Sequence, residues 1–316
     1  MGFVLFGIFA VMEVGLLVWT LKKQGRKGDW LRNCTAVRTV ETAVFLLVIL
    51  LVEGGISFRF KICLLVLFLR LAVALVFWLL KRKKAFDQKS KSGAAVSTCM
   101  GILVLGISLT PAFLFTGYAG LPTTGEYEVK QASVILVDES RTETFESDGS
   151  FREVPVYFYY PDTENTGAEQ FPLVLFSHGA FGYYQSNTST YMELASHGYV
   201  VVSMDHPYHS FFTMDSDGKM ITVNPEFLNE VMRINSDEAA PEEVLEHAKD
   251  GMETWIAGSE HMNFTDLPLF SPILAAKLGT GSRDAQECVE IMNEVVLQYF
   301  DHYLKGKGAL NIKESY

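Results

Sequence analysis

Two groups of residues in the second half of the chain have types and spacings suited to chemistry. In the stretch DHPYH, His206 and His209 are separated by two residues, and with Asp205 they could hold a metal ion at the end of a strand. No ligand from a distant part of the sequence accompanies them, so a loop with hydrogen-bonded histidines is favoured and no metal is expected. In the second group, Ser259 lies two residues before His261, a spacing that favours one face of a strand for a hydroxyl and a base.

A third stretch, MDSDGKM at 214–220, has the acidic spacing with which a calcium-binding loop begins. The later ligands of such a loop are absent, including a glutamate at its twelfth position. A tight hairpin turn over Asp217 and Gly218 is therefore the favoured interpretation.

Charge and hydropathy divide the 316 residues into two parts. Residues 1–117 contain 15 Lys and Arg and 5 Asp and Glu, whereas residues 118–316 contain 11 and 32. The acidic second part disfavours nucleic acid as a partner, because its phosphates need cationic side chains. The four cysteines are too dispersed for a disulfide framework or a zinc cluster.

The first part has the composition of a membrane domain. About 20 apolar residues span a bilayer as a helix, and four stretches approach this length, at 2–21, 39–56, 62–80 and 94–117. The loops after the first and third stretches are rich in Lys and Arg, which places them in the cytoplasm. We therefore expect a multi-pass integral membrane protein with its N-terminus and its residues 118–316 outside the cytoplasm.

The first and the third apolar stretch each contain an ionisable residue. Glu13 and Arg70 are costly in lipid, so we expect them to face the interior of the bundle and to contact each other. A structural ion pair is favoured over a transport or proton-relay role, because no chain of ionisable groups connects the two sides of the membrane.

Alternating and continuous apolar runs predict the elements of the second part. Residues 126–138 and 152–162 alternate as two antiparallel strands, and 171–207 read as a strand, a helix over about 186–197 and a second, parallel strand. Helical patterns follow at 224–250, with a break near Pro241, and at 284–306.

Two of these stretches carry a family resemblance. FPLVLFSHGAFGYYQSNTSTYMELASHGYVVVSMDHPYH (171–209) and GSEHMNFTDLPLFSPILAAKLGTG (258–281) resemble α/β-hydrolases similar to platelet-activating-factor acetylhydrolase and dienelactone hydrolase. The resemblance implies acyl-ester hydrolysis without a metal or organic cofactor. It also implies that His261 is the general base, that the N–H of Ala180 stabilises the oxyanion, and that Gly179 allows close approach of the backbone.

The nucleophile that such a family requires is missing. A G-x-S-x-G elbow does not occur in the sequence, and Ser236 is the only serine in the interval, about 220–258, where the nucleophile and acid belong. The resemblance therefore covers the two ends of a hydrolase domain, and we infer a missing middle segment near Asp250 and Gly251. Without its central strand the apolar edge of 173–177 would be unpaired, unless residues 254–257 pair beside it.

Substitutes for the missing groups are few. Ser177 precedes the His-Gly turn and is expected to point away or to cap the chain locally, and Ser259 lacks the sharp turn of an elbow. Asp205 and Asp266 are available acids, although Asp266 is expected to brace its loop. The nucleophile and the acid stay unassigned.

These observations predict an α/β fold, with an incomplete, α/β-hydrolase-like parallel sheet in residues 118–316 preceded by a four-helix transmembrane bundle in residues 1–117. The function expected is that of a membrane-anchored serine ester hydrolase of the acetylhydrolase type, or of a catalytically impaired, truncated relative. The expected partners are the bilayer and a small ester or phospholipid substrate. The alternative is a non-catalytic membrane protein whose outer domain binds a lipid or a partner.

Overall fold

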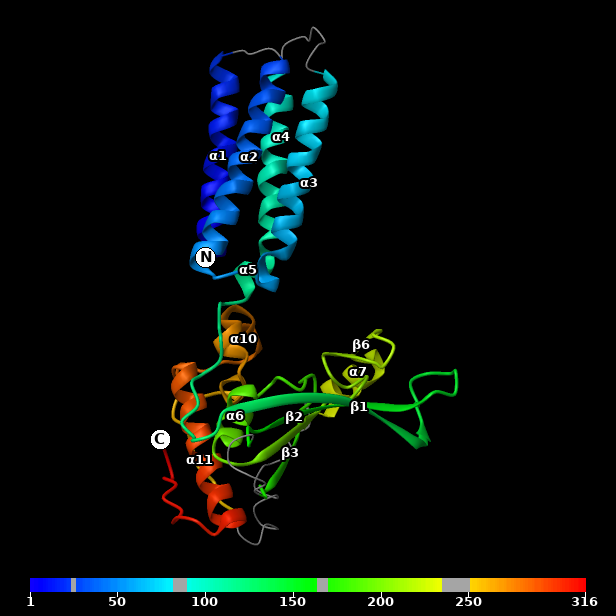
Figure 1. The fold of residues 1–316 in the computed structure, drawn as a ribbon, viewed down its shortest axis with the longest axis vertical. Helices are drawn as coiled ribbons and strands as arrows, with labels where there is room; N and C mark the ends of the chain where they lie inside the picture. Colours follow the sequence, from blue (N-terminus) through cyan, green and yellow to red (C-terminus); the bar gives the residue numbers. More distant parts are fainter. Residues whose placement is uncertain (24–26, 82–89, 164–169, 235–250) are drawn as a thin grey trace. The chain divides into compact units, whose positions relative to one another are not determined.

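The computed structural model describes residues 1–23, 27–81, 90–163, 170–234 and 251–316 (Figure 1). The chain divides into two compact units, one of residues 1–117 with 270–272 and one of residues 118–269 with 273–316. The segment around residue 250 and Ser236 lie outside the described residues.

The first unit is a bundle of four helices that are long and apolar enough to cross a membrane: α1 (Gly2–Lys23), α2 (Lys27–Val52), α3 (Phe58–Lys81) and α4 (Lys91–Ser108). A short helix, α5 (Thr110–Leu114), follows. Leu5, Phe9, Phe45 and Phe60 are fully buried between the helices. Many apolar side chains on the outside are exposed, as expected for helices whose solvent is lipid.

Helix α2 begins about twelve residues before the apolar stretch that predicted it. The added turns bury Trp30 and Cys34 against Leu16 of α1 and Ala94 of α4. Residues four apart lie on one face of a helix, so this pair extends the bundle-facing side of α2.

The predicted contact between the two ionisable residues of the bundle is confirmed. Arg70 of α3 forms an ion pair with Glu13 of α1, and its other terminal nitrogen lies 3.2 Å from Glu41 of α2. The second carboxylate was not part of the prediction. Three helices are thus joined by charges in the interior of the bundle.

The second unit contains a mixed four-stranded sheet of order β1-β2-β4-β3, formed by β1 (Val129–Thr142), β2 (Phe151–Pro161), β3 (Leu173–Ser177) and β4 (Val200–Met204). Strands β1 and β2 are antiparallel, and β3 and β4 are parallel, joined by α6 (Thr188–Ser196). The predicted α/β class and the predicted strand-helix-strand unit are confirmed.

One face of this sheet is covered by helices. Tyr159, Val201 and Phe176 pack there against α6 and against α11 (Ala285–Lys305), the long helix predicted for 284–306. On the other face, alternate residues of β3 are open to solvent, with Leu173 57% and Leu175 63% exposed.

Of the two outcomes expected for the edge of 173–177, the pairing with 254–257 is not formed. Trp255 instead forms an isolated bridge with Ser315, near the end of the chain. Within the described residues, β3 pairs only with β4, so its outer edge carries unpaired backbone groups.

Shorter elements complete the unit. Strands β5 (Phe212–Met214) and β6 (Met220–Thr222) form the predicted hairpin, in which Gly218 adopts a φ of 78°, a conformation that favours glycine. Helix α7 (Pro225–Ile234) follows, and the 3-10 helix η1 (His261–Phe264), α9 (Leu267–Phe270) and α10 (Pro272–Leu278) lie before α11.

Candidate functional site

The parallel strands β3 and β4 end together, with Ser177 opposite Met204. In α/β sheets ligands bind beyond the carboxyl ends of such strands. The loops that leave this edge begin with His178 and Gly179 after β3 and with Asp205 and His206 after β4.

At this edge the hydroxyl of Ser177 is hydrogen-bonded to a histidine. The Oγ atom of Ser177 lies 2.7 Å from Nε2 of His206, and Ser177 is exposed while His206 is half-buried. Local capping, one of the two roles expected for Ser177 from the sequence, is therefore not what its hydroxyl does. Its hydroxyl faces a base at the distance that nucleophile and base pairs require.

The surroundings of His206 favour its neutral form, which is the form that acts as a base. Burial, the neighbouring His178 and His209, and Arg152 all lower the pKa of the His206 imidazole below its ordinary value. The neutral ring then predominates at neutral pH. With its proton on Nδ1, the ring accepts the hydrogen of Ser177 at Nε2.

Contacts with buried side chains hold the backbone around His206 in place. The ring of His178 is 4.8 Å from that of His206, and its Nε2 lies 2.8 Å from the hydroxyl of Ser210. The N–H of His206 donates to the same hydroxyl over 3.0 Å. The carboxylate of Asp205 accepts from the N–H of Tyr184 over 2.7 Å and from the hydroxyl of Thr213 over 2.8 Å.

Asp205 is consequently occupied by structural hydrogen bonds and does not orient His206. Burial raises the pKa of Asp205, against the effect of its hydrogen bonds and of His178. Within the described residues no carboxylate is hydrogen-bonded to His206. In the part of the chain that the structure describes, Ser177 and His206 therefore form a dyad.

The turn after β3 leaves room beside this dyad. Gly179 and Ala180 are exposed, and a Cβ atom on Gly179 would meet nothing within 4 Å. No hydrogen bond within the described residues uses the N–H of Ala180. Phe181 has a φ of 64°, a strained value for a bulky residue, and its N–H donates to the carbonyl of His209 over 3.3 Å.

His261 lies in another part of the unit. It begins η1 and is exposed, and within the described residues no interaction joins it to Ser177 or to the turn at 178–180. Its role as a base stays a prediction, as does the oxyanion role of Ala180. The hydroxyl of Ser259 donates to the carbonyl of Ile256 over 2.7 Å.

Asp266 braces the segment that follows His261. Its Oδ2 atom accepts from the N–H of Ser189 over 2.8 Å, at the start of α6, while its own N–H donates to the carbonyl of Ser186. Oδ1 is buried without a hydrogen-bond partner among the described residues. Burial raises the pKa of Asp266 to about 6.

The two histidines considered as metal ligands have other contacts. His206 is bonded to Ser177, and the ring of His209 stacks on Phe227 with 4.0 Å between ring centres. Within the described residues no group of three His, Cys, Asp or Glu side chains is placed to hold a metal ion.

Comparisons with known proteins agree with the resemblance. Residues 153–215, which include Ser177 and His206, match the family described as platelet-activating factor acetylhydrolase, isoform II. No curated protein matches the chain.

Two solved structures are similar in part. A ferulic acid esterase from Streptomyces cinnamoneus shares 17% identity over 61% of this chain and 95% of its own, with a TM-score of 0.48. A hypothetical protein from Pseudomonas aeruginosa shares 14% identity over 60% of this chain and 58% of its own, with a TM-score of 0.21. On the family match, residues 153–215, which contain β3 and β4, are related to α/β-hydrolases of the platelet-activating-factor acetylhydrolase type.

Proposed function

We propose that residues 118–316 hydrolyse carboxylic esters through Ser177 and His206, and that the four apolar helices anchor this unit to a membrane. The observation that carries the proposal is the 2.7 Å contact between Oγ of Ser177 and Nε2 of His206. The match of residues 153–215 to an acetylhydrolase family supports an acyl ester as the substrate class.

The dyad has the groups needed for acyl transfer. Oγ of Ser177 attacks the ester carbonyl carbon while its proton moves to Nε2 of His206, and the carbonyl electrons move onto oxygen. The N–H of Ala180 is the donor proposed for that oxyanion. Collapse of the intermediate breaks the bond to the alcohol, which leaves with the proton from His206.

Water then completes the cycle. His206 removes a proton from water as the water oxygen attacks the acyl-serine, and Ser177 leaves with that proton as the carboxylic acid is released. No cofactor takes part in either step.

Turnover by this dyad should be slow. Among the described residues no carboxylate holds the tautomer of His206, and in a serine protease triad the loss of that function costs about 10⁴-fold in kcat. The strained elbow that projects a serine from the strand is also missing. We therefore expect the highest activity on small esters with an activated leaving group.

Hydrolysis of p-nitrophenyl acetate by the full chain in detergent tests the proposal. Ser177→Ala and His206→Ala should reduce the rate to that of the uncatalysed reaction, and Ser259→Ala and His261→Ala should retain it. Circular dichroism establishes that each variant is folded. Loss of the rate in His261→Ala but not in His206→Ala would contradict the dyad and support the role implied by the family resemblance.

A folded protein without activity above background would also contradict the proposal. The remaining function would then be the non-catalytic one, in which the outer unit binds a lipid or a partner. Binding of an ester without turnover, measured by calorimetry with the same substrate, would distinguish that case.

A further inference from the structure

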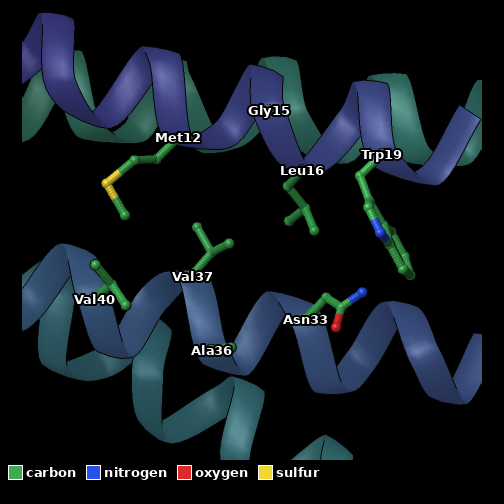
Figure 2. A pocket seen from close by; sticks show the side chains of 8 residues that line it. All are labelled: Met12, Gly15, Leu16, Trp19, Asn33, Ala36, Val37 and Val40. Carbon is green, nitrogen blue, oxygen red and sulfur yellow. The ribbon is translucent and has the colours of Figure 1, made fainter. Parts of the chain in front are cut away.

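A groove of about 450 Å³ lies between α1 and α2 in the first unit, the bundle of four apolar helices. Figure 2 shows the side chains along it, which come from one turn after another of the two helices. Volumes of this size are typical of sites for small molecules. Nothing in the proposed ester hydrolysis uses this groove.

Small residues create the groove. A Cβ atom on Gly15 of α1 would meet nothing within 4 Å, and Ala36 of α2 is exposed. In Figure 2 the space beside these two residues is open, while larger side chains extend on either side of them. In membranes, small residues usually bring helices together, but here they leave the groove open between two helices.

The two ends of the groove differ in polarity. Met12 and Val40 line one end, and Trp19 and Asn33 line the other. The side-chain amide of Asn33 has no hydrogen bond to any residue that the structure describes. Tryptophan is enriched at the headgroup level of the bilayer, and the amide of Asn33 can donate a hydrogen bond to a lipid ester carbonyl there.

Positive charge accompanies the polar end. Lys22 is exposed and lies three residues after Trp19, on the same side of α1. Arg32 precedes Asn33 on α2, and its side chain is 63% exposed, with one contact of 3.5 Å to Asp29. Basic side chains beside a membrane interface attract anionic lipid headgroups.

We propose that this groove binds an anionic phospholipid. One acyl chain lies along Gly15 and Ala36, an ester carbonyl accepts a hydrogen bond from the amide of Asn33, and the phosphate lies near Lys22 and Arg32. The apolar side chains that line the groove favour the acyl chain. The positive charges of Lys22 and Arg32 favour phosphatidylglycerol over phosphatidylcholine.

Photo-cross-linking of the full chain in liposomes tests this site. The probe is phosphatidylglycerol with a diazirine on one acyl chain, and the adducts are mapped by mass spectrometry. We expect adducts within 12–19 and 33–40, and a several-fold lower yield in Gly15→Leu, whose side chain fills the groove. Gly7→Leu is the matched control, because a Cβ on Gly7 also meets nothing within 4 Å.

The headgroup is tested separately. Lys22→Gln should reduce the preference for phosphatidylglycerol over the same probe made as phosphatidylcholine. Equal yields of the two probes on the unaltered chain would overturn the assignment of an anionic lipid. Equal yields from Gly15→Leu and Gly7→Leu would overturn the groove itself, whether or not the chain hydrolyses esters.

Discussion

Ser177 and His206 lie within hydrogen-bond distance because the two strands that carry them run parallel and end together. Ser177 is opposite Met204, and the chain continues from Met204 through Asp205 to His206. The 2.7 Å contact is thus set by the register of a sheet and not by a nucleophile elbow. This origin explains how a serine and a base can meet in a chain without G-x-S-x-G.

The pH dependence of ester hydrolysis reports on the base. Because burial and the neighbouring His178, His209 and Arg152 lower the pKa of His206, the neutral base persists to lower pH than in a free histidine. We expect kcat/KM to rise with pH through a single midpoint below about 6.5 and then to level off. A midpoint above that value would contradict His206 as the base.

Asp266→Asn should alter the pH dependence of stability. Its folded-state pKa is raised to about 6 from 3.8, so the folded protein binds this proton more tightly than the unfolded chain does. The stability it contributes is fully present below pH 3.8 and is lost as pH rises through about 6. The change in the free energy of unfolding caused by Asp266→Asn should therefore be more stabilising at pH 7 than at pH 4, by up to about 3 kcal/mol.

Chemical denaturation at the two pH values measures this difference. Asp138→Asn provides a control of opposite sign, because hydrogen bonds from Ser140 and Arg141 lower the pKa of Asp138. An effect of Asp266→Asn that is the same at both pH values would show that its carboxyl is not perturbed by burial.

Removal of Arg70 should destabilise the bundle strongly. Arg70→Gln leaves Glu13 and Glu41 close together without their cation, and breaking a buried pair in this way costs about 3–5 kcal/mol. Thermal unfolding in detergent measures the loss. Replacing all three residues by leucine should restore most of the stability if the cluster is structural, and failure of that variant to recover would contradict a structural role.

The open edge of β3 should promote aggregation. Leu173 and Leu175 are exposed beside unpaired backbone groups, and a lysine at such an edge opposes pairing with another chain. Leu175→Lys should lower light scattering on mild heating. Leu278→Lys, at a leucine on α10 that is 59% exposed, is the matched control, and an equal effect of the two would indicate general solubilisation.

The elements were largely predictable from the sequence because their patterns are local. The apolar stretches, the strand-helix-strand unit of 171–207 and the helix at 284–306 depend on periodicity within a single segment. The early start of α2 was missed because Trp30 and Cys34 stand among the polar residues Asp29, Arg32 and Asn33 and become a buried face only beside α1 and α4.

Pairings between segments could not be predicted in the same way. Within 254–257, Trp255 pairs with Ser315 and not with β3, because the sequence of a single strand does not specify its neighbour. Ser177 and His206 are 29 residues apart, and only the register of β3 and β4 places them together. Ser177 ends β3 and His206 follows the end of β4 by two residues, and these positions were the signal that could have suggested the contact.

The most direct test of the dyad is to map the serine that reacts with a fluorophosphonate. The full chain is labelled in membranes, digested and analysed by mass spectrometry, with His206→Ala and His261→Ala as variants. The account predicts one adduct, on Ser177, that is lost in His206→Ala and kept in His261→Ala. An adduct on another serine, or no adduct on a folded chain, would contradict it.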